Sequence, residues 1–241
     1  MDKRVVDQAI GGEEPLSARA SRLSLGAAPG IPGKSLSKTA RSAGKRAFDF
    51  GAALVLLILA APLFAVVALL VSMDGGPVFF RHRRVGRGGA LFGCWKFRTM
   101  ILDAEPCLEE YFSHHPQALD EWRREQKLAF DPRVTPIGKF LRRSSLDELP
   151  QLLNVLAGEM SLVGPRPVTV DELRHYGTAA PLYMSARPGI TGLWQVSGRN
   201  DVGYAQRVAL DEQYLQRGGA LLDFLILYRT IGVVLSRRGA R

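Results

Sequence analysis

The longest hydrophobic stretch of the chain runs from Phe50 to Met73 and contains no charged residue. An α-helix needs about 20 apolar residues to cross the hydrocarbon core of a membrane, and this stretch is longer than that. Pro62 lies near its middle, where a proline removes a backbone donor and clashes with the preceding turn. The pattern therefore predicts a membrane helix over 45–76 that is kinked or broken at Pro62.

Such a helix has two geometries open to it: a bent crossing, or a re-entrant hairpin that enters and leaves on one side. Basic residues flank the stretch at both ends, with Lys45 and Arg46 before it and the run Arg81–Arg84 after it. Basic flanks favour the cytoplasmic side of a membrane. Because both flanks are basic, the pattern favours the re-entrant hairpin over the crossing helix. A buried helix of a soluble protein is the simpler alternative.

The residues before this helix, 1–44, are rich in Gly, Ser, Ala, Pro and basic side chains and show little apolar periodicity. Such a composition is typical of a flexible tail. The whole chain of 241 residues carries a formal net charge of +9. This excess attracts polyanions such as anionic lipid headgroups, phosphorylated substrates or nucleic acid, and charge alone does not choose among them.

Short elements follow the membrane helix. Residues 77–84 and 91–100 form two strand-like runs around a glycine-rich turn at 86–89, which predicts a β-hairpin. The whole pattern predicts an α+β fold that is mostly helical, with a small β-hairpin and amphipathic surface helices. The expected helices lie at 104–130 with an interruption near Pro116, at 137–143, at 202–215, and at 221–235, where the segment resembles a helix lying on a membrane surface.

One short segment concentrates charged side chains. Asp147 and Glu148 are adjacent, Arg142 and Arg143 precede them, and Arg166 follows in a Gly-Pro-Arg-Pro turn. Carboxylates beside arginines suit a site that handles phosphate, because guanidinium groups bind phosphate oxygens in pairs. Adjacent carboxylates together with phosphate oxygens also suit Mg²⁺, which takes few protein carboxylates and keeps water and phosphate ligands.

A purely structural explanation of the acidic pair is also open. Ser145 and Glu148 have the spacing of a capping box, which predicts a helix that starts at Ser145 and ends near Gly158. Asp147 is a second carboxylate that a capping box does not require. A helix amino terminus lowers the pKa of nearby carboxylates, so this position predicts an Asp147 that stays ionised and nucleophilic.

Several longer motifs of the chain resemble those of the bacterial sugar transferase family, the monotopic polyprenyl-phosphate phosphoglycosyl transferases. The resemblance runs from about residue 45 to residue 231. That family breaks its re-entrant helix commonly at a Ser-Pro pair, whereas this chain has Ala61 and Pro62, so the proline effect remains without a serine back-bond. The motifs are Lys96–Met100, Asp131–Gly138, Leu146–Asn154, Met160–Pro167 and Arg187–Arg199.

The resemblance implies a reaction. A sugar-1-phosphate, with galactose or glucose preferred, moves from a UDP-sugar to undecaprenyl phosphate with Mg²⁺, and UMP is released. Asp147 would be the nucleophile that forms a covalent phosphosugar intermediate. Glu148 would assist by binding metal, as Asp147 also would, or by deprotonating the lipid phosphate, and the sequence leaves these two roles open. The residues expected to bind substrate are Lys96, Arg98, Arg142, Arg143, Arg166, Arg187 and Arg199.

The resemblance also implies a location. Residues 77–241 would form a catalytic domain on the cytoplasmic face of the bacterial inner membrane, in contact with its phospholipid. A homo-oligomer stays open. A second class of function is a non-catalytic, membrane-anchored basic module that binds anionic lipid or nucleic acid. It accounts for the charge and the anchor but not for the ordered motifs, and the chain has no recognisable nucleic-acid-binding signature.

Overall fold

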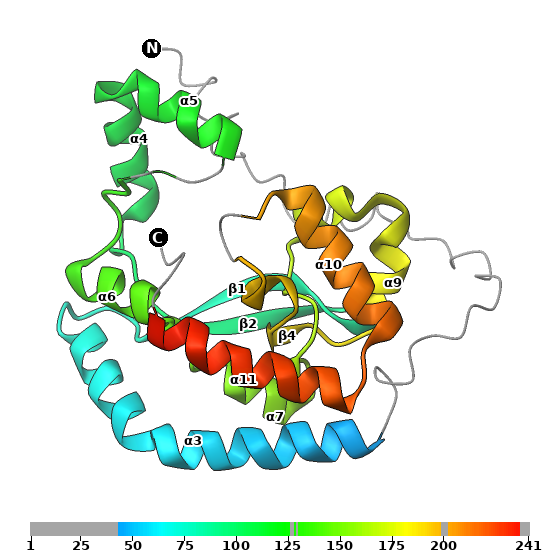
Figure 1. Cartoon of the computed structure of the whole chain (residues 1–241). Helices are drawn as coiled ribbons and strands as arrows, with labels where there is room; N and C mark the ends of the chain where they lie inside the picture. Colours follow the sequence, from blue (N-terminus) through cyan, green and yellow to red (C-terminus); the bar gives the residue numbers. More distant parts are fainter. Residues whose placement is uncertain (1–42, 126–127, 129, 199–201, 237–241) are drawn as a thin grey trace. The chain divides into compact units, whose positions relative to one another are not determined.

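The computed structural model of the chain describes residues 43–125, 128, 130–198 and 202–236 (Figure 1). The expected tail at 1–44 therefore lies almost wholly outside the described residues. The chain divides into two compact units. The described part of the smaller unit lies within Met100–Thr135, and that of the larger unit runs up to Thr99 and resumes at Pro136. The fold is α+β and mostly helical, as predicted.

The smaller unit contains two helices, α4 (Ala104–His114) and α5 (Pro116–Glu125). Pro116 begins the second helix, which confirms the interruption expected there, because proline is tolerated in a first helical turn. Leu108, Phe112 and Leu119 form the buried cluster that joins the two helices.

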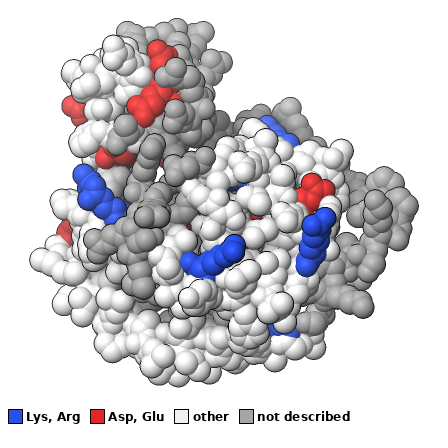
Figure 2. Space-filling view, in the orientation of Figure 1, with Lys and Arg blue, Asp and Glu red and all other residues white. Residues whose placement is uncertain are grey.

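The larger unit opens with the long apolar helix α3 (Ala43–Ser72), which contains Pro62. An 18-residue window of α3 has a mean hydropathy of 3.1 and only 11% of it is buried, so α3 is long and apolar enough to cross a membrane. Figure 1 shows α3 bending partway along its length, and an internal proline is a physical cause of such a bend. Lys45 and Arg46 lie in the first turn of α3, and beyond this beginning the space-filling view shows an uncharged surface over the helix (Figure 2).

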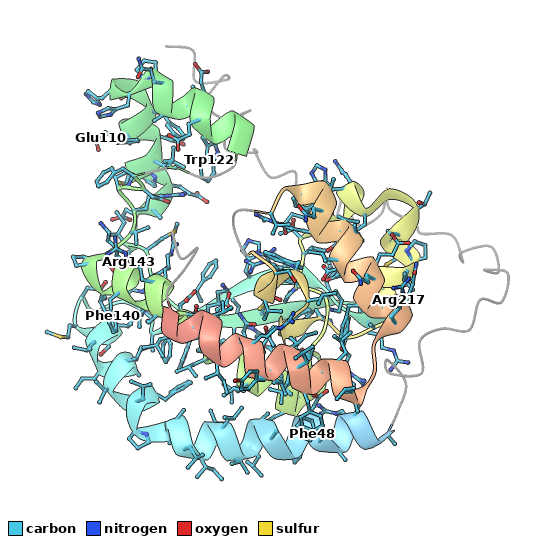
Figure 3. The ribbon with its side chains drawn as sticks, viewed as in Figure 1. Phe48, Glu110, Trp122, Phe140, Arg143 and Arg217 are labelled. Carbon is cyan, nitrogen blue, oxygen red and sulfur yellow. The ribbon has the colours of Figure 1, made fainter. Side chains whose placement is uncertain are left out.

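Polar contacts fasten α3 near its beginning, and Arg98 donates to Val71 O near its end at 3.0 Å. Near its beginning, Lys45 Nζ lies 2.7 Å from Asp223 Oδ2, and Ser161 Oγ donates to Asp49 Oδ2 at 2.7 Å. Asp223 belongs to α11 (Ala220–Ser236). Phe48 of α3 meets Phe224 of α11 edge-on, with ring centres 5.3 Å apart, and Figure 3 shows Phe48 on the side where the two helices run next to each other.

The predicted β-hairpin is confirmed. Strand β1 (Phe79–Val85) pairs antiparallel with β2 (Leu91–Phe97), in a register that sets Phe80 opposite Lys96. The turn between them contains the short helix η2 (Arg87–Gly89), in which Gly88 has a φ of 72°. Glycine adopts this left-handed conformation without the steric cost that a Cβ would add.

A second, parallel pair of strands has no counterpart in the sequence expectations. β3 (Ser161–Val163) pairs with β4 (Gly189–Thr191), although 25 residues separate the two. The backbones approach very closely here: a Cβ on Gly189 would lie 2.1 Å from Gly164 N, and one on Gly192 would lie 2.3 Å from Gly164 O. Glycine at these positions therefore permits the two motifs to meet.

The remaining elements surround these strands; α6, α7 and α10 lie where a helix is expected, whereas the short helices between 170 and 196 are not expected from the sequence. The main buried cluster gathers side chains from α3, β2, α7, β3, α10 and α11. The elements not yet given are α6 (Pro136–Ser144), η3 (Leu146–Glu148), α7 (Gln151–Ala157), α8 (Val170–Leu173), η4 (Arg174–Ala179), α9 (Ala180–Met184), η5 (Trp194–Val196) and α10 (Tyr204–Arg217).

We predict that Gly189→Ala destabilises the protein by roughly 1–3 kcal/mol, because the added methyl group must push the Gly164 backbone away. Thermal unfolding of the detergent-solubilised protein measures the loss. Gly51→Ala is the matched control, since nothing lies within 4 Å of its Cβ position and alanine favours a helix. Equal unfolding temperatures for the two variants would contradict the close approach.

Candidate active site

The adjacent carboxylates lie in the connection between α6 and α7. α6 ends at Ser144, and Ser145 then adopts a left-handed conformation with a φ of 58°. The chain turns through η3, which contains Asp147 and Glu148, before α7 begins at Gln151. A non-glycine residue in the left-handed region stores backbone strain, and such strain is often found beside functional groups.

The capping box expected at Ser145 and Glu148 is wrong. The Ser145 side chain makes no capping hydrogen bond, and the helix proper starts six residues later. The local spacing of serine and glutamate was correct for a cap, but the left-handed turn directs the chain into a 3₁₀ turn first. A complete capping box occurs instead at Thr169 and Glu172, at the start of α8. The expected helix end near Gly158 is confirmed, since Gly158 caps α7 with a φ of 83°.

A single lysine from the β-hairpin reaches both carboxylates. Lys96 Nζ lies 2.7 Å from Glu148 Oε1 and 3.5 Å from Asp147 Oδ2. Each of these three side chains keeps some exposure: 25% for Lys96, 12% for Asp147 and 23% for Glu148. The arrangement therefore holds two acidic groups close together, mostly buried, and still open to an incoming molecule.

The two carboxylates differ in acidity. Burial raises the pKa of Asp147, with the Glu148 charge adding to the effect, while the charges of Lys96 and Arg142 oppose it. Burial also acts to raise the pKa of Glu148, but the charges of Lys96 and Arg166, together with the hydrogen bond from Lys96, outweigh it and lower this pKa to about 2. As the pH falls from neutral, Asp147 is therefore the first of the pair to take up a proton.

The lowered pKa predicted for Asp147 is thus wrong in direction. The prediction assumed that the first turn of a helix surrounds Asp147, whereas it lies in η3 and is 8% exposed. In a buried site, loss of water destabilises the charged form more than a short turn can stabilise it. Asp147 is consequently a more basic carboxylate than an exposed one, which is an advantage for a nucleophile once it is ionised.

Two of the predicted phosphate-binding arginines act on the pair. Arg142 and Arg166 are near enough for their charges to lower the pKa of Asp147 and Glu148 respectively. Arg142 is also oriented by Thr99, whose Oγ1 accepts a hydrogen bond from Nε at 3.0 Å. Arg143 is exposed on the last turn of α6 (Figure 3).

The structure gives Arg98 and Arg187 other contacts. Arg98 is 8% exposed and donates to Asp74 Oδ2 at 2.7 Å and to the carbonyls of Val71 and Pro77 at 3.0 and 2.7 Å. It thereby ties the end of β2 to the end of α3. Arg187 Nε donates to Gly158 O at 2.7 Å, at the end of α7. Arg199 lies outside the described residues.

Sequence reasoning missed Asn154, which positions the hairpin against α7. Its side chain is fully buried, accepts a hydrogen bond from Trp95 N at 2.9 Å and donates to Gly93 O at 2.8 Å. These bonds satisfy the edge of β2 one residue before Lys96. The available signal was a polar residue within the buried stripe of a leucine-rich helix, because such a residue must find partners inside the fold.

The pair can also be tested as a metal site. Among the residues that the structure describes, no group of three or more His, Cys, Asp or Glu side chains could hold an ion. The donor set is therefore limited to the two carboxylates. That set fits Mg²⁺, which is commonly bound through one or two carboxylates with water and substrate phosphates completing its ligands.

A mostly buried acidic pair lies beside cationic side chains, on a chain that carries an exposed helix long and apolar enough to cross a membrane. These features together suit the class of membrane-associated enzymes. Comparison with known proteins identifies the family. A model described as bacterial sugar transferase matches residues 40–237. The chain belongs to the bacterial sugar transferase family, as its motifs indicated.

Named relatives agree with this assignment. The chain is 54% identical to the exopolysaccharide production protein ExoY of Rhizobium meliloti over 197 residues, 81% of this chain and 87% of that protein. It is 50% identical to the undecaprenyl-phosphate galactose phosphotransferase of Salmonella typhimurium, over 81% of this chain and 41% of that protein. It is 39% identical to the UDP-glucose:undecaprenyl-phosphate glucose-1-phosphate transferase of Caulobacter vibrioides, over 87% of this chain and 76% of that protein.

We predict that Lys96→Met moves the acidic limb of the pH–activity profile to higher pH by about one unit, because an opposite charge this close shifts a carboxyl pKa by that order. Without the ammonium group the pKa of Asp147 rises further, so the ionised form is lost at a higher pH as the pH falls. Initial rates at saturating substrate, measured across the acidic pH range, give the apparent pKa of this limb. Lys139→Met, which removes an exposed lysine from α6, is the control and should leave the limb in place.

Proposed function

We propose that the chain transfers a hexose-1-phosphate, galactose or glucose, from a UDP-sugar to undecaprenyl phosphate and releases UMP. This reaction would be the first step in the assembly of an exopolysaccharide or another surface glycan. The observation that carries the proposal is the contact of one Lys96 ammonium with two adjacent carboxylates, beside arginine charges. The names of the relatives, which include galactose and glucose transferases to undecaprenyl phosphate, support the donor and acceptor.

The transfer would take two displacements at the phosphorus that bears the sugar. In the first, an Asp147 carboxylate oxygen bonds to this phosphorus and the bond to the bridging oxygen breaks, so that UMP leaves with that oxygen. In the second, a phosphate oxygen of the lipid attacks the same phosphorus and the Asp147 carboxylate leaves. The product is a sugar diphospholipid, and the enzyme returns to its starting state. Covalent catalysis of this kind replaces one difficult reaction, between the anionic lipid phosphate and the anionic UDP-sugar, by two easier steps.

The neighbouring side chains have defined parts in these steps. Lys96 keeps the carboxylates ionised and close together, against the cost of burying them. Arg142 and Arg166 offset the negative charge that gathers when a phosphate approaches, and positioning with charge neutralisation provides most of the catalysis in phosphoryl transfer. Asp147 and Glu148 are the residues that would hold Mg²⁺, which would add further neutralisation of phosphate charge.

We also propose that α3 is re-entrant and that the site faces the cytoplasm at the bacterial inner membrane. Thirty helical residues in a straight line would extend about 45 Å, enough to separate the two ends across a bilayer. Yet Lys45 near one end and Asp74 just after the other are both bound to the larger unit, through Asp223 and Arg98. These contacts support a helix that bends at Pro62 and keeps both ends on one side.

We predict that Asp147→Asn abolishes the release of UMP, because an amide is not a nucleophile toward phosphorus. Purified protein, undecaprenyl phosphate, Mg²⁺ and UDP-hexoses are the components of the assay. Asp171→Asn is the matched control, since that carboxylate is 63% exposed and pairs only with Arg174 among the described residues. Intact-mass measurement of the wild-type protein with UDP-hexose alone should show the addition of one hexose phosphate. If Asp147→Asn retains the activity of the control, the nucleophile is assigned wrongly.

The membrane arrangement has its own test. Single cysteines are introduced at Gly44, in the first turn of α3, and at Arg83, in β1 after the helix, in protein whose half-buried Cys107 is replaced by serine. Both positions are exposed. The re-entrant geometry predicts that a membrane-impermeant thiol reagent labels both sites from the cytoplasmic face of inner-membrane vesicles. Labelling from opposite faces would establish a crossing helix and refute the hairpin. The buried Cys94 should stay unlabelled, which provides the internal control.

A further inference from the structure

Two arginines from distant parts of the chain lie against one tryptophan ring. Trp194 of η5 is 5% exposed. Arg166, in the turn after β3, has its Cζ 5.7 Å from the ring centre, and Arg207 of α10 has its Cζ at 4.8 Å. Contact of a guanidinium with an indole face fixes the plane of the charged group while its N–H edges remain available. Arg207 is further fixed by donating from Nε to Val202 O at 2.8 Å.

Carboxylates act on these two charges electrostatically without forming a direct ion pair with them in the described part of the chain. Among the ion pairs of the residues that the structure describes, none joins Arg166 or Arg207 to a carboxylate. Glu172 is near enough to act on both electrostatically, and Glu148 and Asp211 also act on Arg166. The Oε2 of Glu172 already accepts from Arg84 at 2.6 Å and from Thr169 N at 2.7 Å. Burial lowers the pKa of Arg207, and the charge of Arg166 lowers it further. An anion between the two guanidinium groups would relieve this repulsion.

Arg166 connects this arginine pair to the acidic site. Its charge is among those that lower the pKa of Glu148, and it also acts on Lys96. The same arginine is the charged group with the largest effect on Arg207. The close approach of Gly164 to Gly189 holds the turn that carries Arg166. A diphosphate whose sugar-bearing phosphorus meets Asp147 thus has a second cationic position available beyond Arg166.

We propose that Arg207, with Arg166 on the Trp194 ring, binds the nucleotide-side phosphate of the UDP-sugar and stabilises it as it leaves in UMP. This inference rests on the proposed function and adds a residue and a role to it. When the bond to the bridging oxygen breaks, negative charge grows on the leaving phosphate, and a guanidinium already in place lowers the cost of that charge. Because UMP departs in the first displacement, Arg207 serves that step and not the attack of the lipid phosphate.

The test uses Arg207→Gln, Arg207→Lys and the control Arg217→Gln. Arg217 is an exposed arginine at the end of the same helix (Figure 3). We expect Arg207→Gln to raise the KM for the UDP-sugar and the Kd for UDP by roughly tenfold or more, the order given by a lost charge-assisted hydrogen bond. The KM for undecaprenyl phosphate should stay unchanged. Arg207→Lys should bind UDP with intermediate strength, since it keeps the charge and loses the planar fork.

Binding of UDP is measured calorimetrically on full-length protein that also carries Asp147→Asn, so this result does not depend on turnover. Unchanged UDP binding in Arg207→Gln would overturn the inference, as would a change in the KM for undecaprenyl phosphate alone, which would assign the arginine to the lipid. If Arg207→Gln fails to fold, the same measurements on Arg207→Lys decide. If the wild-type protein releases no UMP from any UDP-hexose, the proposed function fails, whereas an active wild type with unchanged UDP binding in the variants refutes only the role of Arg207.

Discussion

The charge of Lys96 makes it possible to bury two adjacent carboxylates in one turn. Taking an ionised carboxylate out of water is costly, and placing a second one beside it adds repulsion. The ammonium group meets both, at 2.7 and 3.5 Å, and its charge lowers the pKa of each carboxyl against the effect of burial. With Arg166 adding to the effect, the pKa of Glu148 falls to about 2, whereas burial still leaves the pKa of Asp147 raised. Without the Lys96 ammonium group, the buried carboxylates would be expected to take up protons and lose their charge.

This contact depends on backbone features some distance away. Lys96 belongs to a two-stranded hairpin, which on its own would be marginally stable in water. Asn154 fixes the edge of β2 to α7, and Arg98 binds the end of the same strand to the end of α3. The position of the lysine is therefore set by a buried amide on one side and a buried guanidinium on the other. Loss of either contact would displace Lys96 from the two carboxylates.

Local patterns in the sequence predicted local structure well. Apolar runs and turn residues located α3, the hairpin, α6, α10 and α11, because each of these elements is defined by its own periodicity. The parallel pairing of β3 with β4 was not predictable in this way, since it depends on the meeting of glycines at 164 and 189. The capping box failed for a related reason: its spacing was present, but the left-handed Ser145 that displaced it is set by the packing of the turn.

In the candidate site, too, local sequence predicted some features and tertiary contacts set the others. Residue type and spacing pointed to the acidic pair, Arg142 and Arg166, and the family resemblance added Lys96 as a substrate-binding residue. Neither could separate an arginine at the site from Arg98, whose partners lie within the fold. A guanidinium has the same chemistry in both places, and only its partners differ: Asp74 and backbone carbonyls for Arg98, a tryptophan face for Arg166. An arginine whose acceptors are already inside the protein has little capacity left for phosphate. One whose guanidinium lies over an aromatic ring still presents its donors, and this distinction makes Trp194 informative about the site although it carries no charge.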